Sequence, residues 1–140
     1  MNKYKVGYTT GVFDMFHIGH LNILQKAKEQ CEYLVVGVST DELVQSYKNK
    51  TPVIPFEQRI EIVKAIRYVD EVRPQTSMDK MGAYESIKFD ALFHGDDWKD
   101  SDLYRDIVTK LSEKGVDVVF IKHTDGISST DIQKKINGDK

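Results

Sequence analysis

Two histidines, His17 and His20, are the residues of this chain best suited to chemistry, and they follow a β-rich opening that ends in glycine. Apolar residues after them recur at helical spacing, which places both histidines in the first turn of a helix. A helix N-terminus favours an anion, and Gly19 lets a phosphate approach the backbone. Imidazoles at i and i+3 share one face, so both can direct N–H groups at a phosphate under attack. The pattern predicts electrostatic stabilisation of phosphate chemistry.

Strand and helix patterns alternate along the whole chain, which predicts a single α/β domain over residues 1–140. We expect strands at residues 5–10, 33–39, 71–73, 91–94 and 116–121. We expect helices after the histidines and at residues 55–68, 78–87, 103–113 and 129–136, with Gly115 as a C-cap and residues 40–55 as a basic loop. This alternation implies a Rossmann-like open parallel five-stranded sheet with helices on both faces.

The composition fits a compact enzyme rather than a nucleic-acid binder. The chain has 140 residues, near the usual size of one domain, and a net charge of −2, whereas nucleic-acid binding usually needs a basic excess. Cys31 stands alone, which excludes an intramolecular disulfide and a multi-cysteine zinc site, and we expect it to pack at the end of the first helix. No signal peptide or long apolar run is present, so we expect a cytoplasmic protein with no membrane insertion.

Polar residues gather where the predicted strands end, and in an open parallel sheet the ligand lies beyond those carboxyl ends. The histidines follow the first strand, residues 94–98 the fourth and residues 122–130 the fifth. In the last stretch Gly126 can take a positive φ, and Ser128 and Ser129 can bind a phosphate or cap a helix. A capping role alone would also explain one of these serines.

Other polar residues have two interpretations each. Arg59 and Arg67 lie near one stripe of the helix expected at residues 55–68, where they could bind phosphates or be solvated. Asp14 could hold a loop backbone or meet a magnesium-bound phosphate. We expect no dedicated protein metal site, because Mg²⁺ in such sites is mainly held by substrate phosphates and water.

Residues 11–14, Gly-Val-Phe-Asp, followed by residues 17–20, His-Ile-Gly-His, resemble the signature of the nucleotidylyltransferase superfamily. Within it, the chain resembles the small cytidylyltransferases from about residue 10 to residue 136. Residues 123–130 are similar to the second family signature, although His123 stands where the family usually has arginine. Arg59 and Arg67 are similar to a family pair of arginines, and Lys48 and Lys50 to lysines that close over the reacting phosphates, in a loop one residue longer here.

The resemblance implies roles for individual residues. It implies catalytic roles for His17, His20, Lys48 and Arg67, and acceptor binding by Lys48 and Lys80. It implies nucleotide binding by Val12, Phe13, Asp14, Gly19, Asp97, His123, Thr124, Gly126, Ile127, Ser128, Ser129 and Thr130.

The resemblance also implies a reaction: transfer of CMP from CTP, with Mg²⁺ carried mainly by the CTP phosphates, to a small phosphorylated alcohol. Glycerol 3-phosphate is the expected acceptor, and CDP-glycerol for teichoic acid or capsule synthesis is the expected product. The resemblance also implies that the enzyme is a homodimer. The acceptor phosphate is already ionised near neutral pH, so no strong general base is needed.

The sequence leaves the acceptor and the activity open to different interpretations. Phosphocholine or phosphoethanolamine could be the acceptor, and Tyr84, Trp98 and Tyr104 are candidates for the aromatic cage that choline needs. The chain departs from the glycerol-3-phosphate enzymes at two places. His123 replaces the family arginine, and Ser77 and Met78 stand where those enzymes often have a tryptophan. The chain could also be an adenylyltransferase, or a module that binds a nucleotide without turnover.

Overall fold

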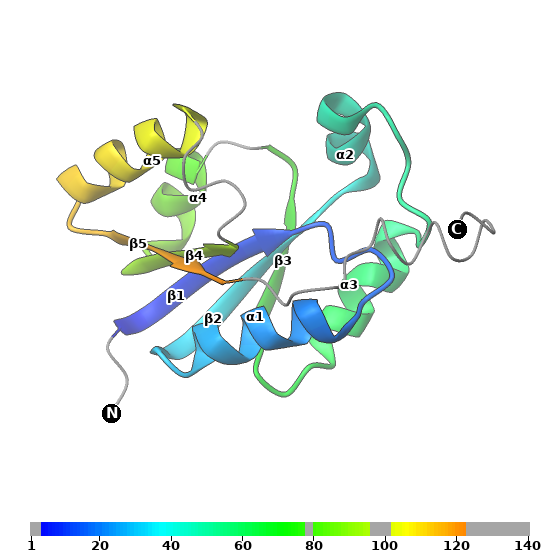
Figure 1. Cartoon of the computed structure of the whole chain (residues 1–140), viewed down its shortest axis with the longest axis horizontal. Coiled ribbons are helices and arrows are strands. Elements are labelled where there is room, and N and C mark those ends of the chain that lie inside the picture. Colours follow the sequence, from blue (N-terminus) through cyan, green and yellow to red (C-terminus); the bar gives the residue numbers. More distant parts are fainter. Residues whose placement is uncertain (1–3, 78–79, 96–101, 123–140) are drawn as a thin grey trace.

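The computed structural model describes residues 4–77, 80–95 and 102–122 and confirms the α/β architecture (Figure 1). The elements run in the order β1 (Tyr4–Gly11), α1 (Ile18–Lys28), β2 (Cys31–Ser39), α2 (Asp41–Lys48), α3 (Phe56–Lys64), β3 (Glu71–Gln75), α4 (Lys80–Ile87), β4 (Ala91–Gly95), α5 (Asp102–Glu113) and β5 (Asp117–Ile121). The five predicted strands are all present, and their ends differ from the predicted ones by at most two residues.

The strands form one sheet in the order β3-β2-β1-β4-β5, and every pairing is parallel. The chain therefore starts in the middle of the sheet, builds outward through β2 and β3, and then crosses to β4 and β5 on the other side of β1. Open parallel sheets bind ligands where the strand order reverses, which here is at the carboxyl ends of β1 and β4. The histidine-containing loop follows β1 and so lies at this switch point.

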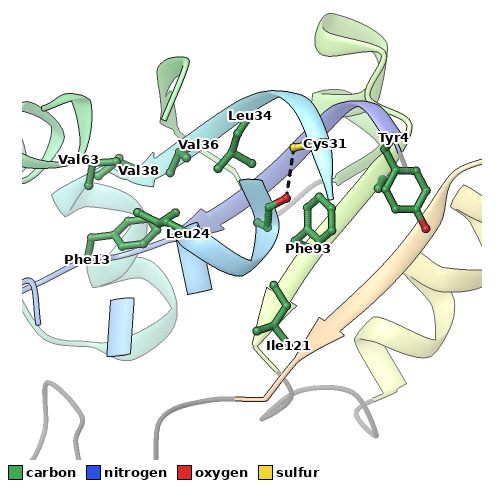
Figure 2. Packing of buried hydrophobic residues seen from close by; sticks show 12 residues of the cluster. Tyr4, Phe13, Leu24, Cys31, Leu34, Val36, Val38, Val63, Phe93 and Ile121 are labelled. Carbon is green, nitrogen blue, oxygen red and sulfur yellow. Dashed lines mark hydrogen bonds between the residues drawn. The ribbon is translucent and has the colours of Figure 1, made fainter. Parts of the chain in front are cut away.

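Helices cover both faces of the sheet, as Figure 1 shows, with α1 and α3 on one face and α4 and α5 on the other. On the first face, Leu24 of α1 and Val63 of α3 pack against Val36 and Phe93 of the sheet (Figure 2). Cys31 also belongs to this core, where its Sγ lies 3.4 Å from the Ala27 carbonyl oxygen. Burial raises the pKa of the Cys31 thiol to about 11, so this cysteine is a packing residue.

Two glycines are required by close approach rather than by turn geometry. A Cβ on Gly7 would lie 2.5 Å from Phe93 Cε2, and one on Gly37 would lie 2.5 Å from the Tyr8 hydroxyl. Any larger residue would force the neighbouring aromatic ring out of the core. Gly37 thus makes room for the Tyr8 side chain on the face covered by α4 and α5.

The prediction of a loop over residues 40–55 is wrong in its first half, because residues Asp41–Lys48 form α2. The Thr40 hydroxyl caps this helix by accepting from the Leu43 N–H at 3.2 Å, and Asp41 and Glu42 complement the dipole in its first turn. Asn49 ends the helix in a left-handed conformation at φ 54°. These capping signals were present in the sequence, but the basic residues that follow hid them.

The helix predicted at residues 55–68 is shorter and ends at Lys64. The chain turns there because Asp70 must meet β2: its N–H donates to the Leu34 carbonyl at 3.0 Å, and its carboxylate accepts from the Leu34 N–H at 2.7 Å. Arg67 therefore lies beyond the helix, and the predicted stripe shared with Arg59 is wrong.

The remaining predicted helices and the predicted cap agree with the structure where it describes them. The helix expected at residues 103–113 begins one residue earlier, and Gly115 has φ 78° with its N–H on the Ser112 carbonyl at 3.0 Å. The helix expected at residues 129–136 lies outside the described residues. Within the described ranges, no helix has the length and apolarity that a membrane span requires.

Candidate active site

The loop between β1 and α1 turns sharply to place His17 at the start of the helix. Phe13 and Met15 adopt left-handed backbone conformations at φ 54° and 49°. Such conformations are strained for residues with a side chain and persist where packing holds them. Here the buried Phe13 ring packs against Phe16 and His20, with ring centroids 6.2 and 5.4 Å away.

His17 and His20 form a capping box at the start of α1. His17 Nδ1 accepts from the Gly19 N–H at 3.1 Å, and His20 Nδ1 accepts from the His17 N–H at 3.2 Å. The rings stack with centroids 3.9 Å apart. Since each Nδ1 accepts a hydrogen bond, the proton of each neutral ring is assigned to Nε2. The cap thus turns both imidazoles into Nε2–H donors.

The structure keeps these rings neutral. Burial lowers the pKa of His17, and burial together with the charge of His17 lowers the pKa of His20 to about 3. The Nε2 atom of His17 is buried and has no hydrogen-bond partner in the described part of the chain. A buried donor without a partner costs about 1–3 kcal/mol, so such a group is suited to an oxygen of a bound ligand.

Arg59 is a structural residue and not the exposed cation that its helical stripe predicted. Its side chain is 0% exposed and donates to the carbonyls of Ile54, Val12 and Ser39 at 2.8, 2.6 and 2.7 Å. Its remaining nitrogen donates to the Asp41 carboxylate at 2.6 Å. Arg59 therefore joins the loops that follow β1, β2 and α2.

Asp14 completes this junction. Its two carboxylate oxygens accept from the Val53 and Ile54 N–H groups, each at 2.8 Å. Of the two roles considered for Asp14, the structure shows the one in which it holds a loop backbone. The segment after α2, which carries Lys50, is thereby tied to the histidine loop. Lys48 is the last residue of α2 and comes directly before that segment.

Arg67 remains an exposed cation on the turn after α3. Its Nη2 donates to the Tyr68 hydroxyl at 2.9 Å, and its guanidinium lies 5.0 Å from the centre of the Tyr68 ring. The hydrogen bond to Tyr68 raises the Arg67 pKa further. The tyrosine orients the guanidinium without neutralising it.

Lys80 is the most unusual charged residue of the described chain. It is 2% exposed, and its Nζ donates to the Thr10 hydroxyl at 2.9 Å. No ion pair joins it to a carboxylate among the described residues, and burial lowers its pKa to about 8. Buried charges are normally paired. Lys80 thus offers a nearly buried ammonium at the carboxyl end of β1.

A cavity of about 310 Å³ opens between β3 and α4, on the side of the sheet that α4 and Lys80 cover. Its lining includes the hydroxyl groups of Tyr8, Thr76, Ser77 and Ser86 together with Arg73. Thr10 and Tyr8 point to this side, because both approach the position that a Cβ on Gly37 would occupy. Burial raises the pKa of Tyr8 to about 12, so this phenol stays protonated.

Sequence reasoning missed Thr10, Asp41 and the structural role of Arg59. Thr10 is a polar residue near the end of a buried strand, which is the one signal that could have indicated it. The structure brings the predicted residues of this region together in the loop after β1 and the first turn of α1: Val12, Phe13, Asp14, His17, Gly19 and His20. Asp97, His123, Thr124, Gly126, Ile127, Ser128, Ser129 and Thr130 lie outside the described residues. Within the described part, no group of three or more His, Cys, Asp or Glu side chains could hold a metal ion.

A parallel sheet in this order, with both imidazoles at its switch point, is the arrangement of an α/β protein that binds its ligand at the carboxyl ends of the strands. The cytidylyltransferase-like family model matches residues 8–135. The glycerol-3-phosphate cytidylyltransferase of Staphylococcus aureus is 35% identical over 93% of both chains, and that of Bacillus subtilis is 37% identical over 93% of this chain and 95% of its own. A lipopolysaccharide core biosynthesis protein from Thermoplasma volcanium superposes with a TM-score of 0.76 at 27% identity, over 87% of this chain and 99% of that one. The chain belongs to the cytidylyltransferase-like family.

Proposed function

We propose that this protein is a glycerol-3-phosphate cytidylyltransferase that makes CDP-glycerol and pyrophosphate from CTP and glycerol 3-phosphate. The observation that carries the proposal is the stacked pair of imidazoles at the switch point of the sheet, one of which has a buried Nε2 without a hydrogen-bond partner among the described residues. The relatives with this printed activity match nearly the whole chain, which supports the same acceptor here.

In the proposed reaction, an oxygen of the acceptor phosphate attacks the α-phosphorus of CTP in line. The bond from that phosphorus to the bridging oxygen breaks, and the electron pair leaves with pyrophosphate. The Nε2–H groups of His17 and His20 donate to the α-phosphate oxygens as negative charge concentrates there. Neither histidine needs to take up a proton, in accord with the lowered pKa of both rings.

Cations neutralise the remaining charge. Arg67 is proposed to contact the triphosphate, Lys48 and Arg67 to neutralise the acceptor and leaving groups, and Lys80, with Lys48, to bind the acceptor phosphate. Mg²⁺, held by the CTP phosphates, would neutralise part of the triphosphate charge. The assignment of Mg²⁺ to the CTP phosphates fits the contacts of Asp14, because both of its carboxylate oxygens accept backbone hydrogen bonds. Asp97, His123, Thr124 and residues 126–130 are proposed to hold the nucleotide.

The activity is tested by pyrophosphate release from CTP with Mg²⁺ and a panel of acceptors: glycerol 3-phosphate, ribitol 5-phosphate, phosphocholine and phosphoethanolamine. We expect the highest kcat/KM for glycerol 3-phosphate. A higher value for another acceptor would overturn the acceptor and keep cytidylyl transfer. No pyrophosphate with any acceptor would favour a nucleotide-binding module, and stronger thermal stabilisation by ATP than by CTP would favour an adenylyltransferase.

We also propose that the enzyme is a cytoplasmic homodimer whose product feeds cell-surface polymer synthesis. Closed two-fold dimers are the commonest oligomers of soluble proteins. Light scattering at micromolar concentration tests the dimer, and a monomeric mass would contradict it.

A further inference from the structure

We infer that Thr10 is a positioning residue for the acceptor: its hydroxyl holds the Lys80 ammonium at the carboxyl end of β1, where the acceptor phosphate binds. The inference rests on the proposed function for its phosphate ligand and on the structure for the contact. The Thr10 oxygen lies 2.9 Å from Lys80 Nζ, although the two residues are 70 positions apart in the chain.

Few described groups hold the Lys80 ammonium. An ammonium has three donors, and the Thr10 oxygen is its one hydrogen-bond partner among the described residues. Its side chain is 2% exposed, so bulk water has little access to the ammonium. An anionic oxygen that arrived beside Thr10 would supply a counter-charge and a further acceptor beyond those that the described residues provide.

The Thr10 hydroxyl also fixes where the Lys80 ammonium lies. A lysine side chain is flexible and gives a point charge with no preferred geometry. Thr10 sits on β1, the central strand of the sheet, one residue before Gly11, which ends the strand. The Thr10 hydroxyl therefore places the ammonium relative to the most rigid part of the fold. A hydrogen bond accepted from an ammonium also favours its charged form, which burial opposes.

The described charged and titratable groups on this side of the sheet include Tyr8, Arg73 and Glu85. Tyr8, on the same face of β1, has a pKa of about 12, well above that of Lys80, and Arg73 of β3 lines the neighbouring cavity. On α4 itself, Glu85 is exposed and pairs with Lys88 at 3.2 Å. Lys80, whose pKa burial lowers to about 8, is distinguished from these groups by its own NMR signal.

The decisive variants are Thr10→Val, which keeps the branched shape and removes the hydroxyl, and Thr10→Ser, which keeps the hydroxyl. Ser39→Ala is the matched control. It removes another buried hydroxyl at the same edge, one that donates to Gln75 at 2.9 Å and does not contact Lys80. Lys80→Met removes the ammonium and identifies the Lys80 signal.

NMR titration of lysine-labelled protein tests the contact without any activity. We expect the pKa of Lys80 to fall in Thr10→Val and to stay at the wild-type value in Thr10→Ser and Ser39→Ala. An unchanged Lys80 pKa in Thr10→Val would overturn the inference. This result is independent of turnover, so it stands even if the wild-type enzyme releases no pyrophosphate and the proposed function fails.

Kinetics test the consequence for the acceptor. We expect Thr10→Val to raise KM for glycerol 3-phosphate about tenfold or more, the scale for a lost hydrogen bond to a charged group, with KM for CTP unchanged. In the Lys80→Met background the same substitution should have no further effect on that KM. An equal loss in both backgrounds, or an equal rise in both KM values, would show that Thr10 acts independently of Lys80 and would overturn the inference.

Discussion

The imidazole rings of His17 and His20 lie stacked with centroids 3.9 Å apart and planes 24° apart, and each Nδ1 accepts a backbone hydrogen bond. The cap uses the Nδ1 side of each ring, and the proposed reaction uses the Nε2 side. The Nδ1 atoms cap α1, and this leaves the Nε2–H groups as donors for a ligand. Substitutions that keep one side and remove the other can separate the two roles.

His17→Asn should separate capping from catalysis. Asparagine is among the best N-cap residues, whereas alanine loses about 1 kcal/mol of stability at this position. We expect both His17→Asn and His17→Ala to lower kcat by roughly 10²-fold, because both remove the charge-stabilising donor. Only His17→Ala should lower Tm. A wild-type kcat in His17→Asn would show that the Nε2–H group takes no part in the reaction.

Acid should destabilise the protein through His20. The pKa of His20 in the folded protein is lowered from 6.5 to about 3, so between these values the unfolded chain binds a proton that the folded protein does not. The free energy of unfolding should therefore fall as the pH drops through this range.

His20→Gln removes this titration and keeps a side chain able to accept from the His17 N–H at N3. Urea denaturation between pH 7 and pH 4 should show that wild type loses more stability than His20→Gln. Parallel curves would contradict the neutral state assigned to His20. All other titrating groups are common to the two proteins, so the difference isolates this ring.

Arg59 and Arg67 should behave oppositely although the sequence placed them on one stripe. Arg59→Met leaves Asp41 and three carbonyl oxygens without their donor, and we expect the free energy of unfolding to fall by at least about 3 kcal/mol. Arg67→Met changes an exposed side chain and should alter stability by less than about 0.5 kcal/mol while raising KM for CTP. Chemical denaturation and initial-rate kinetics on both variants make the comparison. Similar stability losses would refute the different roles.

Asp14→Ala should release the segment that follows α2. The Val53 and Ile54 N–H groups both lose their acceptor, so their hydrogen exchange should accelerate. The Val6 N–H is an internal control, because it also donates to a carboxylate, that of Asp90 at 2.9 Å, near the amino ends of β1 and β4. We expect its exchange to stay unchanged. Unchanged exchange at Val53 and Ile54 would mean that other contacts hold the loop.

The sequence by itself determined the features that depend on local pattern. Continuous apolar runs such as residues 33–39 indicated buried parallel strands, since both faces of such a strand are covered. The spacing of His17 and His20 against the apolar rhythm placed both rings at a helix start, and Gly115 marked a helix end. Apolar periodicity and helix-capping residues are local signals, so they do not depend on a partner that is distant in the sequence.

The tertiary structure alone decided which polar side chains are free for a ligand. An arginine on a helical stripe has the same sequence pattern whether it faces solvent or, as Arg59 does, the carbonyls of Val12 and Ser39. The contact of Lys80 with Thr10, and the use of Asp14 as a backbone acceptor, likewise join segments far apart in the chain. A side chain's chemistry depends on which partners surround it, and only the packing of β1, α3 and α4 around the same sheet edge brings those partners together.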